Sequence, residues 1–228
     1  MRNLGLLGCV GALILALLIF GGYFIGVRNN LVGLDEQVNQ QWAQVKNQYQ
    51  RRYDLIPNLV RTVQGAANFE KSTLEAVVNA RARVGQVAAP SGPPGSAAGI
   101  TTDPAQMAQF AAAQQGLSNA LSRLLVVVER YPELKSNQNF LELQSQLEGT
   151  ENRIAVERQR YNQDAQQFNT AIRRFPASII ANMSGFKAKA YFRGAPGSAQ
   201  APQVDFQPFG NQPAPTATVP STATTGTR

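Results

Sequence analysis

The closest groupings of carboxylate side chains in this sequence are Asp35 with Glu36 and Glu148 with Glu151. Two carboxylates on one face could serve as a general acid and a general base, or bind a divalent cation. Adjacent helical residues diverge by about 100°, whereas a three-residue spacing puts Glu148 and Glu151 on one face. Because a solvated helix face has the same spacing, we predict that the protein is not an enzyme. An enzyme or small-ligand binder that uses helix carboxylates remains an alternative.

Other reactive side chains are scarce, since the 228 residues include no histidine and one cysteine, Cys9. A zinc site of histidine and cysteine, a histidine-activated nucleophile and an intrachain disulfide are therefore excluded. We accordingly predict no cofactor and no metal site. The formal net charge is +7, but charged residues make up only 15% of the chain. Since no long run of like charges occurs, binding to nucleic acid is disfavoured.

The N-terminal residues form the first element that would position the rest. No charged residue lies between Leu4 and Val27, and a helix needs about 20 apolar residues to cross the hydrocarbon core of a bilayer. The run is longer than the apolar region of a signal peptide, which has about 7–15 residues. We therefore predict a transmembrane anchor over residues 1–28, which contacts the lipid bilayer through residues 4–27. Cys9 is interpreted as a small apolar residue within the span.

Apolar residues recur at steps of three and four from Leu34 to Val63, and the same stripe resumes as far as Val84. This spacing is typical of a helix that packs against a partner helix. It predicts one long helix from about residue 29 to about residue 87, with Trp42 in the core. Residues 89–104, which are rich in Pro, Gly and Ser, predict a flexible loop after this helix.

Further helices should pack on the first one. Asp103 followed by Pro104 is an N-cap with proline at the first helical position, which predicts a second helix that ends before Pro132. Ser136 or Asn137 should cap a third helix that ends near residue 174. PASIIANM then predicts a short fourth helix. Three aromatic residues after it are expected to dock on the end of the bundle: Phe186, Tyr191 and Phe192.

The fold class that follows is all-α, with an N-terminal transmembrane helix and an elongated antiparallel bundle of about four helices. We expect the bundle over residues 29–193. Residues 194–228 have few charges and much Ala, Pro and Thr, which predicts a disordered tail. The few basic residues beside the span do not determine its orientation in a bacterial plasma (inner) membrane. The composition favours the extracytoplasmic side for the helical domain.

The stretch RRYDLIPNLV, residues 51–60, places Pro57 inside the first predicted helix. A proline there removes one amide donor and clashes with the carbonyl of Tyr53, four residues earlier, at a cost of about 3 kcal/mol. The helix could kink at Pro57 and continue, or restart with Asp54 as an N-cap. In either case the freed backbone groups need a partner, for which Asn58, the arginines at positions 51 and 52, or water are candidates.

This stretch and its surroundings resemble the LemA family. The region DEQVNQQWAQVKNQYQRRYDLIPNLVRTVQGAANFEKSTLEAVVNARA is similar to the signature of that family, and so are the segment ENRIAVERQRYNQDAQQFNTAIRRFPASIIANMSGFKAKAYF and the final PQVDF. The resemblance covers most of residues 29–206 and implies a single-pass membrane protein with a helical bundle. The loop at 89–104 and the long tail depart from the usual family length. The motif carries over onto Arg51, Arg52, Asp54, Leu55, Ile56, Pro57, Asn58, Leu59 and Val60.

Two sets of residues are candidates for binding. The first set comprises Arg51, Arg52, Asp54, Pro57 and Asn58. It is either a docking motif for an unknown protein partner or a motif that only shapes the fold. The second is a basic cluster near the end of the bundle, which could attract anionic lipid headgroups at about 1 kcal/mol per residue. It comprises Arg173, Arg174, Lys187 and Lys189. We predict a membrane-anchored helical scaffold or interaction protein that could form homo-oligomers. An anionic-lipid-binding or membrane-remodelling module is an alternative.

Overall fold

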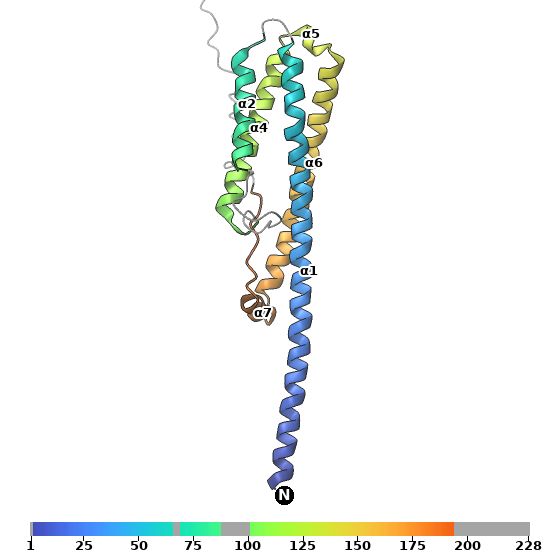
Figure 1. Ribbon diagram of the computed structural model, residues 1–228. Coiled ribbons are helices and arrows are strands. Elements are labelled where there is room, and N and C mark those ends of the chain that lie inside the picture. The colour runs from blue at the N-terminus through green and yellow to red at the C-terminus, as the bar shows by residue number, and fades with distance from the viewer. Residues whose placement is uncertain (1, 66–68, 88–100, 194–228) are drawn as a thin grey trace, which may run out of the picture. The chain divides into compact units, whose positions relative to one another are not determined.

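The computed structural model describes residues 2–65, 69–87 and 101–193, with side chains from residue 11 onward (Figure 1). These ranges contain helices and no strand, which confirms the predicted all-α fold. The helices are α1 (Arg2–Gln64), α2 (Lys71–Val87), α4 (Pro104–Val128), α5 (Pro132–Lys135), α6 (Gln138–Arg173) and α7 (Ala177–Met183). The predicted tail, residues 194–228, lies outside the described residues.

Helix α1 passes through two different environments. The large apolar side chains from Leu13 to Phe20 are exposed. From residue 11 onward the helix is long enough, and contains a stretch apolar enough, to cross a membrane. Leu31 is buried, and from Val38 onward α1 buries a residue at every third or fourth position, including Trp42 and Val45. One uninterrupted helix of 63 residues, about 95 Å long at 1.5 Å per residue, thus joins an apolar segment to the core of the bundle.

The predicted single helix over residues 29–87 is wrong, because the chain reverses between α1 and α2. Arg81 of α2 contacts Tyr53 of α1, although a continuous helix would separate these residues by about 42 Å. α1 ends next to Gly65, a poor helix former. Glu70 then opens α2, since its carboxylate accepts a hydrogen bond from Thr73 Oγ1 at 3.2 Å and its carbonyl accepts one from Thr73 N. The apolar residues of α2 have the spacing that a continuation of α1 would have. The sequence pattern therefore does not reveal that α1 ends.

The caps predicted for the next two long helices are confirmed. Asp103 Oδ1 accepts a hydrogen bond from Ala105 N at 2.8 Å at the start of α4. Asn137 Oδ1 accepts from Asn139 N at 3.0 Å at the start of α6. Residues 89–100 of the predicted loop lie outside the described residues. Its end is not a loop, because Thr101 is helical and buried and its carbonyl accepts a hydrogen bond from Ala190 N at 2.6 Å.

The helices pair as α1 with α6 and as α2 with α4, and α7 packs against both α1 and α6 (Figure 1). Two buried clusters hold the pairs together. We call the first the distal core; it includes Ile56, Leu59, Val63, Leu74, Val77, Leu117, Leu121, Leu124, Phe140 and Leu147. We call the second the proximal core; it includes Val38, Trp42, Val45, Tyr49, Met107, Phe110, Ile154, Tyr161, Ala165, Phe168 and Phe192.

The aromatic residues of the proximal core surround Trp42, which confirms its predicted place in the core. The Trp42 ring lies 5.6 Å from the centroid of Phe110 and 5.8 Å from that of Phe192. Phe192 therefore docks along the side of the bundle, on α1 and α6, and not at its end. Tyr191 remains 39% exposed, so the expectation that it docks is wrong.

Candidate functional site

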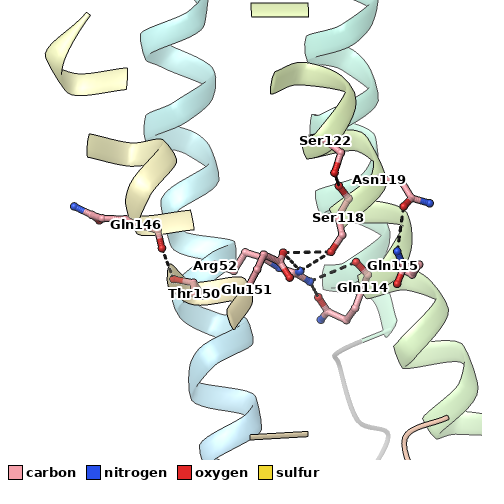
Figure 2. A network of polar contacts seen from close by, with 9 residues as sticks. All are labelled: Arg52, Gln114, Gln115, Ser118, Asn119, Ser122, Gln146, Thr150 and Glu151. Carbon is pink, nitrogen blue, oxygen red and sulfur yellow. Dashed lines mark hydrogen bonds and ion pairs between the residues drawn. The ribbon is translucent and has the colours of Figure 1, made fainter. Parts of the chain in front are cut away.

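Arg52 lies inside the bundle and connects three helices (Figure 2). Its side chain is 1% exposed. Arg52 Nη1 donates a hydrogen bond to Ser118 Oγ of α4 at 2.8 Å and forms an ion pair with Glu151 of α6. Arg52 Nη2 donates to the side-chain and backbone oxygens of Gln114 on α4. The residue thus ties α1 to α4 and α6 at the level where the two cores meet.

The position of Arg52 follows from the helical register of α1. Tyr49 and Ile56 are buried, and Arg52 lies three residues after the first and four before the second. The neighbouring Tyr53, which has the apolar side chain of the two, is only half-buried. The guanidinium also lies 5.2 Å from the centroid of the Tyr49 ring. Arg52 therefore occupies a core position, and the three-and-four spacing around it was the signal that could have revealed this.

Two features make the Arg52 network asymmetric. The side chain of Glu151 is 41% exposed, so water reaches one end of the ion pair. Arg52 Nε is buried and donates to no acceptor among the residues that the structure describes. The cation is thus the desolvated partner, and its stabilisation depends on Ser118, Gln114 and Glu151. The arrangement links side chains of α1, α4 and α6 through one buried guanidinium.

The carbonyl of Tyr53 that Pro57 leaves without an intrahelical donor has a partner from another helix. Helix α1 continues through Pro57, so the alternative in which it restarts there is wrong. Arg81 Nε of α2 donates to the Tyr53 carbonyl at 3.3 Å, and its guanidinium lies 3.7 Å from the centroid of the Tyr53 ring. Arg81 thus supplies the donor that the proline removes.

The remaining polar residues of the motif lie on the surface. Arg51, Asp54 and Asn58 are exposed at steps of three and four, whereas Pro57 is half-buried. Asp54 accepts a hydrogen bond from Gln50 at 2.8 Å, and Asn58 accepts one from Arg61 at 2.6 Å. Because Arg52 is buried, the five residues of the predicted docking motif do not form one exposed patch.

The predicted basic cluster is also divided by burial. Arg173, Arg174 and Lys187 are exposed. Lys189 is 6% exposed and lies within the bundle, where its Nζ pairs with Asp35 of α1 at 2.7 Å. The expectation that Lys189 belongs to an exposed cluster is therefore wrong, because its charge is already balanced by a neighbouring carboxylate.

The segment over residues 186–193, which we call the C-terminal strap, is held along α6 by side chains of that helix. Asn169 and Asn162 each exchange two hydrogen bonds with the backbone of the strap, at Lys189 and Phe192 respectively. Tyr161 Oη donates to the carbonyl of Ala190 at 2.9 Å. The amide side chains imitate a neighbouring strand, so the extended backbone of the strap is satisfied without a sheet.

Burial has shifted the pKa values of three side chains in this region. It raises the pKa of Tyr161 well above its usual value, with a smaller contribution from Tyr191. It also raises the pKa of Tyr49, which the charges of Arg158 and Arg52 partly offset. The pKa of Asp164 is raised by burial as well. Both tyrosines are therefore neutral at physiological pH, where the Tyr161 hydroxyl can donate to the strap.

The carboxylates considered for acid–base chemistry or for a divalent cation are not gathered in one place. Glu151 is engaged by Arg52, whereas Glu148 is exposed and accepts a hydrogen bond from Gln144. Asp35 is paired with Lys189, and its neighbour Glu36 is exposed. Within residues 11–65, 69–87 and 101–193, no group of three His, Cys, Asp or Glu residues could hold a metal ion.

Comparison with known proteins gives one family and several relatives. The model of the LemA family matches residues 41–206. The chain is 30% identical over 178 residues to the magnetosome proteins MamQ 1 and MamQ 2 of Paramagnetospirillum magneticum (strain ATCC 700264 / AMB-1). It is 29% identical to the magnetosome protein MamQ of Magnetospirillum gryphiswaldense (strain DSM 6361 / JCM 21280 / NBRC 15271 / MSR-1). Each alignment covers 74% of this chain and 65% of the relative, so the chain spans less than two thirds of their length.

Proposed function

The chain belongs to the LemA family, and on this premise we propose that it is a membrane-anchored helical scaffold that presents an exposed polar face to a protein partner. The observation that carries the proposal is the continuity of α1. The same helix has an exposed apolar segment around residues 13–25 and contributes Val38 through Val63 to both cores. A bundle built on such a helix moves with its anchor, as a scaffold requires.

Polar contacts with α1 support this proposal at two levels of the helix. Lys189 pairs with Asp35 near the apolar segment, and Arg52 reaches α4 and α6 further along. Hydrogen-bonded charges of this kind have well-defined geometry, and in some proteins they specify the register of helices more than they add stability. The bundle would therefore be held on α1 in one arrangement, so that its surface has a defined orientation relative to the membrane.

The face that we assign to a partner consists of Arg51, Asp54, Asn58 and Arg61, and we call it the α1 polar face. All four side chains are exposed and lie on one side of α1 at steps of three and four. The face carries both signs of charge and an amide, which suits a partner with a mixed polar surface. Charged and polar residues at the edge of an interface, such as the α1 polar face, determine specificity more than affinity.

Photo-crosslinking of the full chain in cells would test the partner. A photoreactive residue is placed at Asp54 in one variant and at Asn58 in a second. The control is Glu148, an exposed carboxylate on α6. We expect the same adduct from Asp54 and Asn58, no such adduct from Glu148, and loss of the adduct when Arg51 and Arg61 are both changed to Ala. An equal adduct at Glu148, or none at the first two sites, would contradict the assignment.

A further inference from the structure

The surface around α7 carries large apolar side chains that nothing in the described bundle covers. Phe175 is 83% exposed, Met183 is 72% exposed and Ile179 is 52% exposed. Phe175 precedes α7, while Ile179 and Met183 lie four residues apart on one side of it. The other side of this short helix contributes Ile180 and Ala181 to the interior. We call the three exposed side chains the α7 apolar face.

The pairing of α1 with α6 places this face along the length of α1. Gln37 donates a hydrogen bond to Asp164 at 3.2 Å, and Gln41 donates one to Glu157 at 2.5 Å. The two helices are antiparallel, so moving toward the C-terminus along α6 corresponds to moving toward the N-terminus along α1. Arg173, the last residue of α6, lies nine residues after Asp164, and it is therefore level with Arg28, nine residues before Gln37. Helix α6 therefore ends beside the end of the uncharged run at residues 4–27, and α7 follows directly.

The burial pattern of α1 agrees with this placement. Leu13 through Phe20 are exposed, whereas Phe24 and Val27 are half-buried and Leu31 is buried. α7 packs against α1, and in Figure 1 it lies at the end of the bundle nearest the N-terminal part of that helix. If residues 4–27 cross a bilayer, α7 lies at the boundary between the bilayer and water.

The two segments that meet at α7, residues 1–34 and 165–193, carry charges of one sign, and the next acidic residue of α1, Asp35, is paired with Lys189. No Asp or Glu occurs in residues 1–34 or 165–193. Arg173, Arg174 and Lys187 are exposed there, and they flank the α7 apolar face on both sides in the sequence. A short apolar face bordered by cations alone is complementary to an anionic bilayer surface, where apolar side chains enter the headgroup boundary and cations bind phosphates.

We propose that α7 is an interfacial anchor that lies on the bilayer crossed by α1. Phe175, Ile179 and Met183 enter the boundary between headgroups and acyl chains, and the three exposed cations bind anionic headgroups. This proposal rests on the proposed anchoring by α1. The second contact fixes the rotation and tilt of α1, because a helix held at one point alone can turn about its axis. The α1 polar face would thereby keep one direction relative to the membrane.

Lipid quenching of the full chain in vesicles tests this anchor. Cys9 is changed to Ala, a single cysteine is introduced as Met183→Cys, and a fluorescent label is attached. The control is Val126→Cys, a 70% exposed position on α4. Both proteins are reconstituted in vesicles of phosphatidylcholine and phosphatidylglycerol that contain brominated lipid. We expect strong loss of fluorescence at position 183 and none at position 126.

The outcomes separate the two proposals. Protein that floats with the vesicles but shows equal fluorescence at both positions overturns the α7 anchor and leaves the α1 anchor standing. A label at position 183 that is shielded from an aqueous quencher but not reached by brominated lipid indicates a contact with protein, such as a second copy of the chain, and also overturns it. Protein that does not float contradicts the anchoring by α1 and the α7 anchor together.

The role of the cations is tested by charge-neutral variants of the labelled Met183→Cys protein. The triple change Arg173→Gln, Arg174→Gln and Lys187→Gln is expected to reduce lipid quenching, as is omission of phosphatidylglycerol. Lys46→Gln, Arg83→Gln and Arg123→Gln form the matched control, since these cations are exposed elsewhere on the bundle. The assignment of the headgroup contacts would be overturned if the triple variant near α7 left lipid quenching unchanged. It would also be overturned if the control triple variant reduced quenching equally.

Discussion

Arg52 places a guanidinium where the stripe of α1 otherwise has apolar side chains. The sequence alone does not easily show which of two adjacent arginines is buried. Arg51 and Arg52 have the same side chain, but Arg51 is exposed and Arg52 is buried. The acceptors that make burial tolerable lie 62 to 99 residues away, on α4 and α6. The motif could therefore be located from sequence, whereas its division into one buried and several exposed residues required the tertiary structure.

The asymmetry of the ion pair leads to a prediction for its two partners. Removal of Glu151 leaves a buried cation, whereas removal of Arg52 leaves a carboxylate that water already reaches. We expect Glu151→Ala to lower the free energy of unfolding by about 3 kcal/mol, and Arg52→Met, which fills the same space, by about 1 kcal/mol. Reversible unfolding of the full chain in detergent would measure both. A larger loss for Arg52→Met would contradict the buried network.

Tyr161 gives a pH-dependent prediction. Its pKa is raised in the folded chain, so its contribution to stability is complete below the unfolded pKa of about 10 and decreases as the pH rises above it. Tyr161→Phe should lower the free energy of unfolding by about 1 kcal/mol at pH 7, because the Ala190 carbonyl loses its donor. The variant should also lose less stability than the parent between pH 10 and pH 11, measured by thermal unfolding. Equal slopes would contradict the assigned pKa shift.

At the scale of elements, the helix caps were the most predictable feature and the turn after α1 the least. Asp103 and Asn137 act locally, so their side chains and the amides that they cap are encoded within a few residues. The reversal of the chain between α1 and α2 is different. The apolar stripe keeps its phase from Val63 to Leu74 and beyond. Whether α2 extends α1 or folds back to pack on α4 depends on tertiary contacts. The spacing of apolar residues does not determine it.

The contact between Arg81 and Tyr53 gives a prediction for the pairing of α1 with α2. Arg81→Ala removes both the donor and the stacked guanidinium, and we expect it to lower the free energy of unfolding by about 1–2 kcal/mol. In a Pro57→Ala background the amide of residue 57 can again satisfy the Tyr53 carbonyl. The cost of Arg81→Ala should therefore be smaller there, by about 1 kcal/mol in a double-mutant cycle. Additive effects would show that Arg81 does not replace the lost donor.

At the scale of the whole described chain, α1 is the element on which the account depends. Its apolar first part and its heptad-like second part were both predicted from sequence, since each is a local pattern of side chains. The position of α7 beside the end of the span was not predicted. It depends on the register between α1 and α6, which polar pairs such as Gln37 with Asp164 set over a separation of 127 residues.

The most direct test of the account is the distance between two spin labels on α1, one in the apolar segment and one in the bundle. Leu18 and Gln40 are exposed, and an unbroken helix separates them by about 33 Å. In the full chain carrying Cys9→Ala and reconstituted in vesicles, we expect a single narrow distance distribution near that value. A broad distribution, or one centred at a much shorter distance, would show that α1 is interrupted between the membrane and the bundle and would contradict the account.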